Sequence, residues 1–386
     1  MDAQKVVMVL AESCHNDSRV MREAKKLAEA GYAVVILALH KKGLSRIEER
    51  DGYVIIRLCC WLPDGSIVAM VVREAFFYFF SFLGILWIRP VVCHIHNPRA
   101  LIPGVCAAKL VRAKIIYDSH EWWETALHRT DFPRWIFVLV VDMENYFAHK
   151  ADVILTVSGS IARILRRRFH RPVFLIRNVS EIYTGPKNNL LREVLGLVDD
   201  ERKIILYQGL FLQKRGILET INAMQWVDRG AIFVLLGCDG DRARGITAKE
   251  LKAEINRLGL SNRVFIYGPV PAEAMLDYTA SADVGVCTLD ASCGNHYRSL
   301  ANKFFCYAAA WLPVAVNNFP EMGGLVRRYH IGVTLDSIDP SEIAEKLNIL
   351  LQSNGEFKEG IIRFNEVFNW KREGNRLLKI YERLLN

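Results

Sequence analysis

Several signatures of common enzyme classes are absent from this chain of 386 residues. No Gly-x-Gly-x-x-Gly follows the first predicted strand, where the letters ESCHNDSR stand instead, and no Walker Gly-x4-Gly-Lys-Ser/Thr motif occurs. Dinucleotide-dependent hydride transfer and P-loop phosphoryl transfer are therefore disfavoured. Internal repeats and low-complexity tracts are also missing, which excludes collagen-like and coiled-coil architectures for the whole chain.

The nine cysteines form no CxxC pair, and no cysteine–histidine cluster has the spacing of a zinc site. Their number is odd, and several stand inside apolar runs that resemble strands. This usage predicts free thiols in a reducing cytosol rather than a disulfide framework.

Targeting and membrane-spanning segments are likewise not evident. The first residues, MDAQKVVMVLAES, have a strand pattern and lack the basic and apolar regions of a signal peptide. The longest apolar run, Ala75–Ile88, has 14 residues, fewer than the roughly 20 that cross a bilayer as a helix. We therefore expect a soluble or peripheral protein in the cytoplasm.

The composition supports more than one globular core. Hydrophobic residues make up 51% of the chain and charged residues 24%, and about 150 residues per domain suggests two domains. The net charge of +8 favours an anionic partner such as a nucleotide or a phospholipid surface. No nucleic-acid-binding module accompanies this charge, so nucleic acid is not an expected partner.

Short β-rich runs alternate with helical patterns in both halves of the chain. Such alternation predicts α/β domains with parallel sheets that helices cover on both faces. We expect two doubly wound, Rossmann-like domains that face each other across a cleft, joined by a polar connection. The predicted strands are 5–10, 32–39, 53–59, 91–96, 114–118, 152–157 and 172–176, then 203–207, 231–236, 264–267, 284–288 and 314–317.

Polar residues and glycines gather after the strands in both halves. Ligands of open α/β sheets bind beyond the carboxyl ends of the strands, so this placement predicts a site between the domains. The segments concerned are 12–19, 94–99, 118–124, 209–216, 237–241 and 289–299.

The segment YQGLFLQKRG, residues 207–216, is the candidate phosphate site. Gly209 follows a strand, and Lys214, Arg215 and Gly216 precede a helix. Amides at a helix start favour phosphate, and a guanidinium can bind two of its oxygens. The segment therefore indicates a nucleotide diphosphate site; the alternative is a solvated basic loop.

Two histidines of CHIHNP, His94 and His96, lie on one face of a predicted strand, and DSHEWWE with Glu121 ends the next one. We interpret His96 and Glu121 as candidate catalytic or substrate-contacting groups, with structural capping as the alternative. A metal site is not expected, because nothing here requires three or four ligands with a second shell.

The segment RRRFHR, residues 166–171, concentrates four arginines and His170. It reads as a solvated helix face or as a contact for an anionic membrane surface. The run Ala75–Ile88 could dock on the same surface or be a buried helix.

Taken together, these segments resemble the GT-B-fold glycosyltransferases of family 4 (group 1), which act on nucleotide sugars with retention. The resemblance covers nearly the whole length. It rests on the order and spacing of NDSRVMREAKKLAEAGYAV at 16–34, HIHNPRALIPG at 94–104, IIYDSHEWWE at 115–124, ADVILTVSGSIARIL at 151–165, IILYQGLFLQKRG at 204–216, ADVGVCTL at 282–289 and NHYRSLANKFFCYAAAWLPVAV at 295–316.

The resemblance implies a donor held by the C-terminal domain and a last helix that crosses back to the first domain. The expected divisions are a first, acceptor-side domain at 1–182, a linker at 183–202, a nucleotide-sugar domain at 203–365 and the crossing helix at 366–386. It implies catalytic His96 near the transferring sugar. The implied donor contacts are Gly209, Lys214, Arg215, Val270, Asn302 and Lys303, and the acceptor-side residues are Asp17, Arg19 and His120.

The chain departs from the family pattern at the Glu-x7-Glu pair. Cys306 stands at the second glutamate and Arg298 near the first, and a neutral thiol accepts hydrogen bonds from ribose hydroxyls poorly. Trp311 replaces the usual glycine at a helix end.

We expect an enzyme of polysaccharide biosynthesis that transfers a sugar from a nucleotide diphosphate sugar to a hydroxyl of a glycan or lipid-linked acceptor. Neither a metal nor a separate cofactor is expected, because Arg215, Lys303 and helix amides would stabilise the departing diphosphate. The departures leave two alternatives: an impaired GT-B protein that acts as a partner or regulator, and a nucleotide-sugar epimerase.

Overall fold

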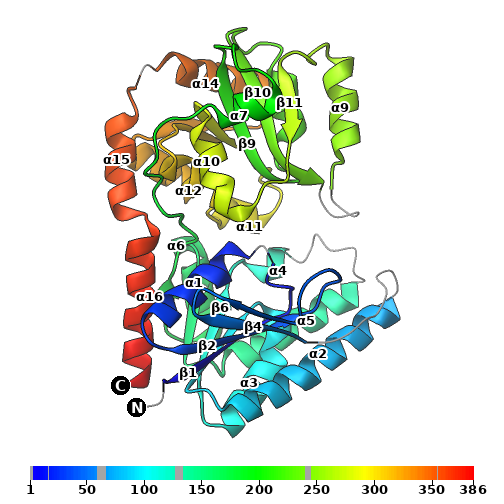
Figure 1. The fold of residues 1–386 in the computed structure, drawn as a ribbon, viewed down its shortest axis with the longest axis vertical. Coiled ribbons are helices and arrows are strands. Elements are labelled where there is room, and N and C mark those ends of the chain that lie inside the picture. Colours follow the sequence, from blue (N-terminus) through cyan, green and yellow to red (C-terminus); the bar gives the residue numbers. More distant parts are fainter. Residues whose placement is uncertain (1–2, 16, 59–66, 127–133, 240–244, 354) are drawn as a thin grey trace. The chain divides into compact units, whose positions relative to one another are not determined.

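The computed structural model describes residues 3–15, 17–58, 67–126, 134–239, 245–353 and 355–386. They form two compact α/β units, which Figure 1 shows with their elements labelled. The first unit comprises residues 1–177 together with 374–386, and the second comprises residues 178–373.

In the described residues, the first unit contains an eight-stranded sheet of order β3-β4-β2-β1-β5-β6-β7-β8. Neighbouring strands pair in parallel, except for the antiparallel pair β3–β4 at one edge. The strands are β1 Lys5–Leu10, β2 Ala33–Leu39, β3 Ile47–Arg50, β4 Tyr53–Leu58, β5 Val92–His96, β6 Lys114–Ser119, β7 Val153–Thr156 and β8 Val173–Leu175.

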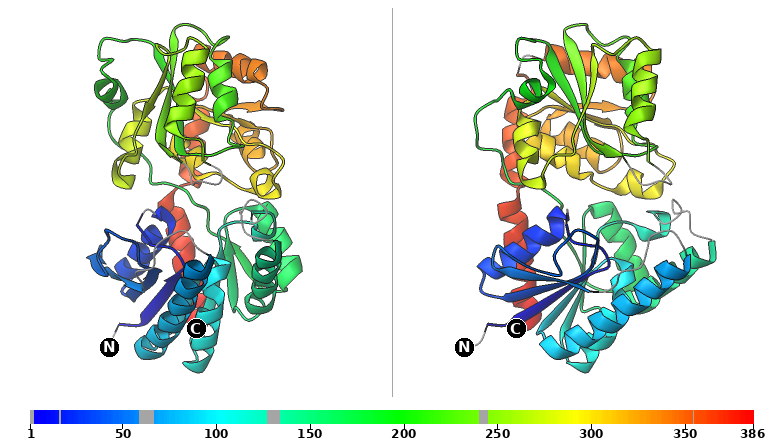
Figure 2. Two further views of the ribbon diagram at one scale, coloured as in Figure 1. Left: turned by 90° about the vertical axis from the view of Figure 1, so that its right-hand side faces the viewer. Right: turned by 45° about the vertical axis from the view of Figure 1, so that its right-hand side comes forward.

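Helices cover both faces of this sheet (Figure 2). Along β1, Val7 and Val9 join the core under α2, α3, α5 and α6, whereas Val6, Met8 and Leu10 join the core under α1 and α16. This alternation explains why the strand is apolar throughout. The helices are α1 Ser18–Glu29, α2 Ile67–Ile88, the 3-10 turn Pro98–Ala100, α3 Leu101–Leu110, α4 Trp123–Ala126, α5 Arg134–Ala148, α6 Gly159–Phe169 and α16 Trp370–Leu385.

The apolar run at 75–88 is part of a longer helix than its composition indicated. Helix α2 has 22 residues, because the chain already turns helical at Ile67. The argument that this segment is too short to cross a bilayer was therefore wrong. Among the described residues, α2 meets the requirements of a membrane span by length and composition alone.

In the described residues, the second unit contains a six-stranded parallel sheet of order β11-β10-β9-β12-β13-β14. Its strands are β9 Lys203–Phe211, β10 Ala231–Asp239, β11 Val264–Tyr267, β12 Val284–Cys287, β13 Val314–Asn317 and β14 Gly332–Leu335. Its helices are α7 Leu190–Leu195, α8 Ile217–Ala223, α9 Ala248–Arg257, the 3-10 turn Ala272–Ala274, α10 Met275–Ala280, α11 Gly294–Arg298, α12 Asn302–Ala309, α13 Met322–Tyr329, α14 Pro340–Gln352 and α15 Lys358–Val367.

The alternation of strands and helices predicted from the sequence is confirmed, with both sheets dominated by parallel pairs. The segment read as a polar connection contains α7, whose Leu191 is fully buried in the second core. The seven cysteines in the described part of the chain are free thiols. Cys59 and Cys60 lie outside the described residues, as do residues 240–244 beyond β10.

Candidate functional site

The loop after the central strand β9 adopts an unusual backbone conformation. Lys214 has φ +61° and Gly216, just before α8, has φ +62°, so both lie in the left-handed region. For a non-glycine residue such as Lys214 this conformation costs about 1–3 kcal/mol. The carbonyl of Lys214 accepts a hydrogen bond from the Asp290 amide at 3.0 Å, and its Nζ donates to Ser292 Oγ at 3.0 Å. These contacts hold the loop that presents half-buried Arg215.

Lys303, in the first turn of α12, is the most unusual cation of the second unit. Its side chain is buried, and Nζ has no hydrogen-bond partner among the described residues. The ammonium instead lies 3.3 Å from the centroid of the Tyr207 ring, a cation–π contact. Burial, with a smaller contribution from the charge of Arg215, lowers the pKa of Lys303 to about 7. A buried amine without an anionic partner is poised to receive one.

Three glycines allow close backbone packing at the ends of these strands, and one of them, Gly209, lies beside the amine. A Cβ on Gly209 would lie 3.8 Å from Lys303 Nζ, and Gly209 is in register with Gly237 on β10. A Cβ on Gly237 would lie 2.0 Å from the Gly209 carbonyl oxygen, and one on Gly268 would lie 3.1 Å from the Gly237 carbonyl oxygen. The close approach excludes larger residues and leaves bare backbone beside Lys303, which a ligand can approach.

The structure thus brings Gly209 and Lys303 together, and Arg215 is near enough for its charge to act on Lys303 and Tyr207. Lys214 is directed to Ser292 instead. Val270 packs against the core of the second unit, and Asn302 is exposed at the start of α12. Sequence reasoning missed Tyr207, although an aromatic residue two positions before Gly209 on the same strand could have indicated a platform.

The three residues that depart from the family pattern, Cys306, Arg298 and Trp311, each contact a neighbouring side chain or carbonyl group. Cys306 Sγ lies 3.0 Å from Ser180 Oγ, and the Arg298 guanidinium carbon lies 5.6 Å from the Tyr297 ring centroid. Trp311 has φ +67°, the left-handed conformation that favours glycine, and its indole N–H donates to the Tyr183 carbonyl at 2.8 Å. That hydrogen bond offers a physical reason why tryptophan is tolerated at this helix end.

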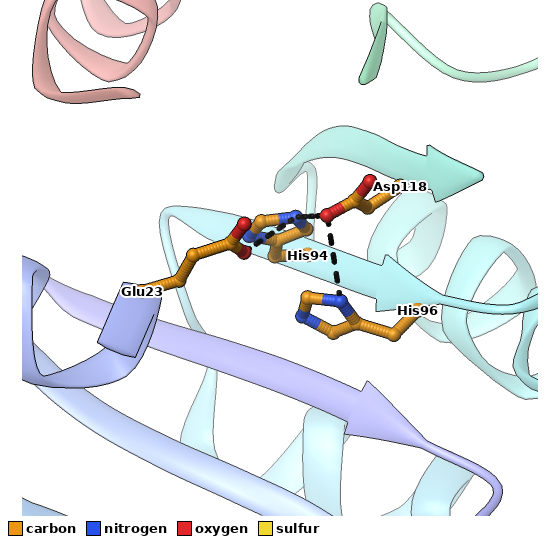
Figure 3. Close-up of side chains that lie close together, drawn as sticks. All are labelled: Glu23, His94, His96 and Asp118. Carbon is orange, nitrogen blue, oxygen red and sulfur yellow. Dashed lines mark ion pairs between the residues drawn. The ribbon is translucent and has the colours of Figure 1, made fainter. Parts of the chain in front are cut away.

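In the first unit, the β5 and β6 strand ends surround a buried ion pair, part of which Figure 3 shows. Arg19 donates from Nε to Asp118 Oδ2 at 2.9 Å and from Nη2 to Asp118 Oδ1 at 3.0 Å. Its Nη1 donates to the Ile176 carbonyl at 2.7 Å, and Nε lies 3.2 Å from Glu23 Oε1. Burial alone would raise the pKa of Asp118, but the charges of Arg19 and His120 hold it well below its usual value.

The histidines after β5 and β6 form a second part of this network. His96 Nδ1 lies 3.2 Å from His120 Nε2, which is 3.3 Å from Asp118 Oδ2. Burial, reinforced by His94, lowers the pKa of His96 well below its usual value. Burial opposes protonation of His120, but Asp118 raises its pKa. When His120 is protonated, its Nε2–H can donate to both Asp118 Oδ2 and His96 Nδ1, and a neutral His96 that accepts at Nδ1 carries its own proton on Nε2.

That assignment leaves His96 Nε2–H as a donor without a partner among the described residues. Neighbouring His94 stacks on His96 with ring centroids 4.3 Å apart, and its Nδ1 lies 2.8 Å from the hydroxyl of Tyr381 on α16. Burial raises the pKa of Tyr381 well above its usual value, so its hydroxyl is neutral and forms this hydrogen bond as donor or acceptor, according to the tautomer of His94. The C-terminal helix thus supports the strand that carries His96.

Four side chains of this cluster could hold a metal in the described part of the chain. Glu23, His94, His96 and Asp118 each offer a ligand atom within 4.8 Å of the others (Figure 3). The two carboxylates already share the Arg19 guanidinium, which would repel a cation placed between them. The arrangement therefore fits a buried ion-pair network better than a metal site.

The remaining residues proposed for the first unit differ in their burial and in the groups they contact. Asp17 caps α1, its Oδ1 accepting from the Val20 amide at 3.1 Å. The Arg19 side chain is buried and bonded to protein atoms, so an acceptor contact for Arg19 stays a prediction that this geometry does not favour. Glu121 is half-buried, directly after His120. Sequence reasoning missed Glu23, although its i, i+4 spacing from Arg19 on an apolar helix face could have indicated a buried pair.

The family models and the curated relative that match this chain are all glycosyltransferases. Residues 17–178 match the family model described as "Glycosyl transferase 4-like domain", and residues 202–353 match "Glycosyl transferases group 1". A curated relative, D-inositol 3-phosphate glycosyltransferase of Xylanimonas cellulosilytica, is 26% identical over 194 residues, which cover 50% of this chain and 44% of that protein. The chain thus matches less than half the length of that relative.

Solved structures share the fold over nearly the whole chain. Sucrose-phosphate synthase from Thermosynechococcus elongatus superposes with a TM-score of 0.81 at 16% identity, covering 99% of both chains. A glycosyltransferase from Rickettsia africae gives a TM-score of 0.74 at 13% identity and covers 100% of both. Anabaena HepE, solved in complex with UDP-glucose, gives 0.71 at 15% identity and covers 98% of this chain and 99% of its own.

Proposed function

This chain belongs to the group 1 glycosyltransferases of family 4, with the GT-B fold, and we propose that it transfers a sugar from a nucleotide diphosphate sugar to a hydroxyl acceptor. The buried ammonium of Lys303, which has no hydrogen-bond partner in the described part of the chain, is the observation that carries this proposal. It lies beside bare glycine backbone, and the charge of Arg215 acts on it. A diphosphate is the anion that this combination of cations and amides suits best.

The chemistry follows from where negative charge develops. Cleavage of the donor's glycosidic bond passes through an oxocarbenium-like transition state and leaves charge on the diphosphate. We propose that Lys303, Arg215 and the backbone after β9 stabilise that charge, so that the reaction requires neither a metal nor a separate cofactor. In the first unit, His96 Nε2–H is the proposed donor to the sugar or its leaving group. Retention of configuration is part of this proposal by family analogy.

Donor and acceptor are proposed by class. UDP-glucose is the first donor to test, because HepE was solved with it. The acceptor is proposed to be a glycan or lipid-linked hydroxyl in polysaccharide biosynthesis, at a cytoplasmic location.

A second candidate is a nucleotide-binding protein that regulates an active transferase. Cys306 and Arg298 favour it, since neither side chain replaces a carboxylate that accepts hydrogen bonds from ribose. An epimerase is a third candidate, because histidine and carboxylate groups lie close together around Asp118.

Calorimetric titration with nucleoside diphosphates, followed by turnover of nucleotide sugars with and without acceptors, separates the three candidates. The transferase requires acceptor-dependent release of the diphosphate. Binding without turnover across donors and acceptors supports the regulator, and an epimerised sugar without acceptor supports the epimerase. Arg215→Ala should weaken nucleotide binding roughly tenfold to a hundredfold. Lys249→Ala, an exposed cation on α9, is the matched control. Undiminished turnover by Arg215→Ala would refute the diphosphate assignment.

A further inference from the structure

Helix α2 exposes an apolar stripe along its whole outer face. From Phe76 to Trp87 the exposed side chains are mostly three or four residues apart, which places them on one face of the helix. Trp87 is 83% exposed and Phe79 57% exposed. The principal members of the stripe are Val71, Phe76, Phe79, Phe80, Leu83 and Trp87. Surface helices usually place charged and polar residues on this side, so the stripe needs a partner.

Helix α5 repeats the feature in the same layer. Trp135, Val138, Leu139 and Tyr146 are exposed at helical spacing. Helix α3 contacts both α2 and α5, and all three cover the same face of the first sheet. The two apolar stripes therefore belong to one continuous helical layer of the first unit (Figure 1).

The same layer is basic. Helix α6, which contacts α5, contains no acidic residue and exposes Arg163, Arg166 and Arg167. Exposed Lys109 lies in the last turn of α3, and exposed Arg89 follows α2. In the described residues of these helices, the exposed carboxylate is that of Asp142; Glu74 is partly buried and paired with Arg99, and Glu144 is buried. Apolar side chains flanked by arginines complement an anionic phospholipid surface.

The buried inner face of α2 determines the orientation in which this helix can bind a phospholipid surface. Phe77, Ser81 and Ile85 are fully buried, and α2 contacts β1, β2 and β4. If α2 crossed a bilayer, these side chains would leave the core of the first unit. The helix therefore fits the plane of the interface and not a spanning orientation. A second copy of the chain is a poorer occupant, because a two-fold interface would set one basic layer against another.

We propose that the outer layer formed by α2, α3, α5 and α6 is a membrane-docking face that lies on an anionic bilayer, with the α2 stripe inserted among the lipid headgroups. This face belongs to the first unit alone, and the proposal does not depend on the transferase activity. It requires only that the folded protein meets a lipid surface carrying negative charge.

Flotation of the purified chain with lipid vesicles tests the proposal. We expect the protein to float with phosphatidylcholine–phosphatidylglycerol vesicles, to float much less with phosphatidylcholine alone, and to be released by salt. The double variant Phe79→Glu/Trp87→Glu should lower partitioning at least about tenfold. Arg163→Gln/Arg167→Gln should lower binding to anionic vesicles about fivefold for each arginine and reduce its salt dependence.

The controls keep loss of binding apart from loss of folding. Trp226→Glu changes a tryptophan of the second unit that is 59% exposed, and it should float like the parent protein. Thermal melting and circular dichroism of each variant show whether it is folded. If the double variant Phe79→Glu/Trp87→Glu does not fold, the single variant Trp87→Gln is tested in its place. Absence of binding to anionic vesicles, or equal binding by parent and Phe79→Glu/Trp87→Glu, overturns the proposal. So does a lipid-free dimer that Trp87→Glu dissociates, or resistance to alkaline carbonate extraction from membranes.

Discussion

Binding of a nucleoside diphosphate should take up a proton at Lys303. The free protein holds this side chain buried beside Tyr207, with a pKa of about 7. At pH 8 about nine-tenths of the molecules then carry a neutral amine. A diphosphate placed against Nζ favours the ammonium and raises its pKa, so complex formation should bind close to one proton.

The direction in which affinity changes with pH follows from the direction in which binding shifts the pKa of Lys303. Because the pKa is low in the free protein and higher in the complex, affinity is greatest at low pH and falls as pH rises through about 7. If the pKa in the complex exceeds 9, the charged fraction of free Lys303 falls from about one half at pH 7 to about one hundredth at pH 9. Affinity should then fall about fiftyfold, or about 2.3 kcal/mol.

Isothermal calorimetry at pH 8 in buffers with different ionisation enthalpies measures the proton uptake directly. Lys303→Gln should lose both the uptake and the pH dependence, and Lys303→Arg should lose the pH dependence while keeping a charge. Lys249→Gln, exposed on α9, controls for general charge. The reasoning is refuted if the parent protein takes up no proton, or if Lys303→Gln takes up as much.

Three further perturbations test other parts of the structure. Asp118→Asn weakens the pairing of buried Arg19 and should cost about 3–5 kcal/mol of unfolding free energy by denaturant titration; a cost below 1 kcal/mol would contradict a buried ion pair. Gly237→Val would place its Cβ 2.0 Å from the Gly209 carbonyl oxygen, so calorimetry should show weaker nucleotide binding and melting a lower Tm, and unchanged values for both would contradict the close approach. Tyr381→Phe removes the hydroxyl that is hydrogen-bonded to His94 Nδ1 and should cost about 1–3 kcal/mol of unfolding free energy; no change would mean that this hydrogen bond contributes no net stability.

Much of the fold was predictable because periodicity is a local property of the chain. Strand β1 at Lys5–Leu10, strand β11 at Val264–Tyr267 and strand β13 at Val314–Asn317 begin and end where their patterns indicated. The length of the α2 helix was misjudged because Arg73 and Glu74 interrupt its apolar residues, so that only the uninterrupted run at 75–88 was counted. Short elements such as β14 and α7 were missed because few residues define their pattern.

Part of the candidate site was also predictable, since the carboxyl ends of parallel strands collect polar residues at one edge. Gly209, Arg215 and Lys303 were named from such positions. Their partners were not, because Tyr207 and Lys303 are far apart in sequence and meet only through packing of α12 on the sheet. The sequence also could not show whether Arg19 contacts an acceptor substrate or is buried against Asp118, because an arginine looks the same in both cases. Its hydrogen bond to Asp118 on β6 is visible only in the folded chain.

The order of residues by itself determined the α/β class, the membership in the glycosyltransferase family and the surplus of positive charge, because these depend on local periodicity, motif spacing and composition. Only the tertiary structure decided that Lys303 is a buried amine with no hydrogen-bond partner among the described residues, that Arg19 belongs to an ion pair, and that the apolar face of α2 remains outside the core. Burial and pairing depend on which distant segments pack against a side chain, and no single segment of the sequence carries that information.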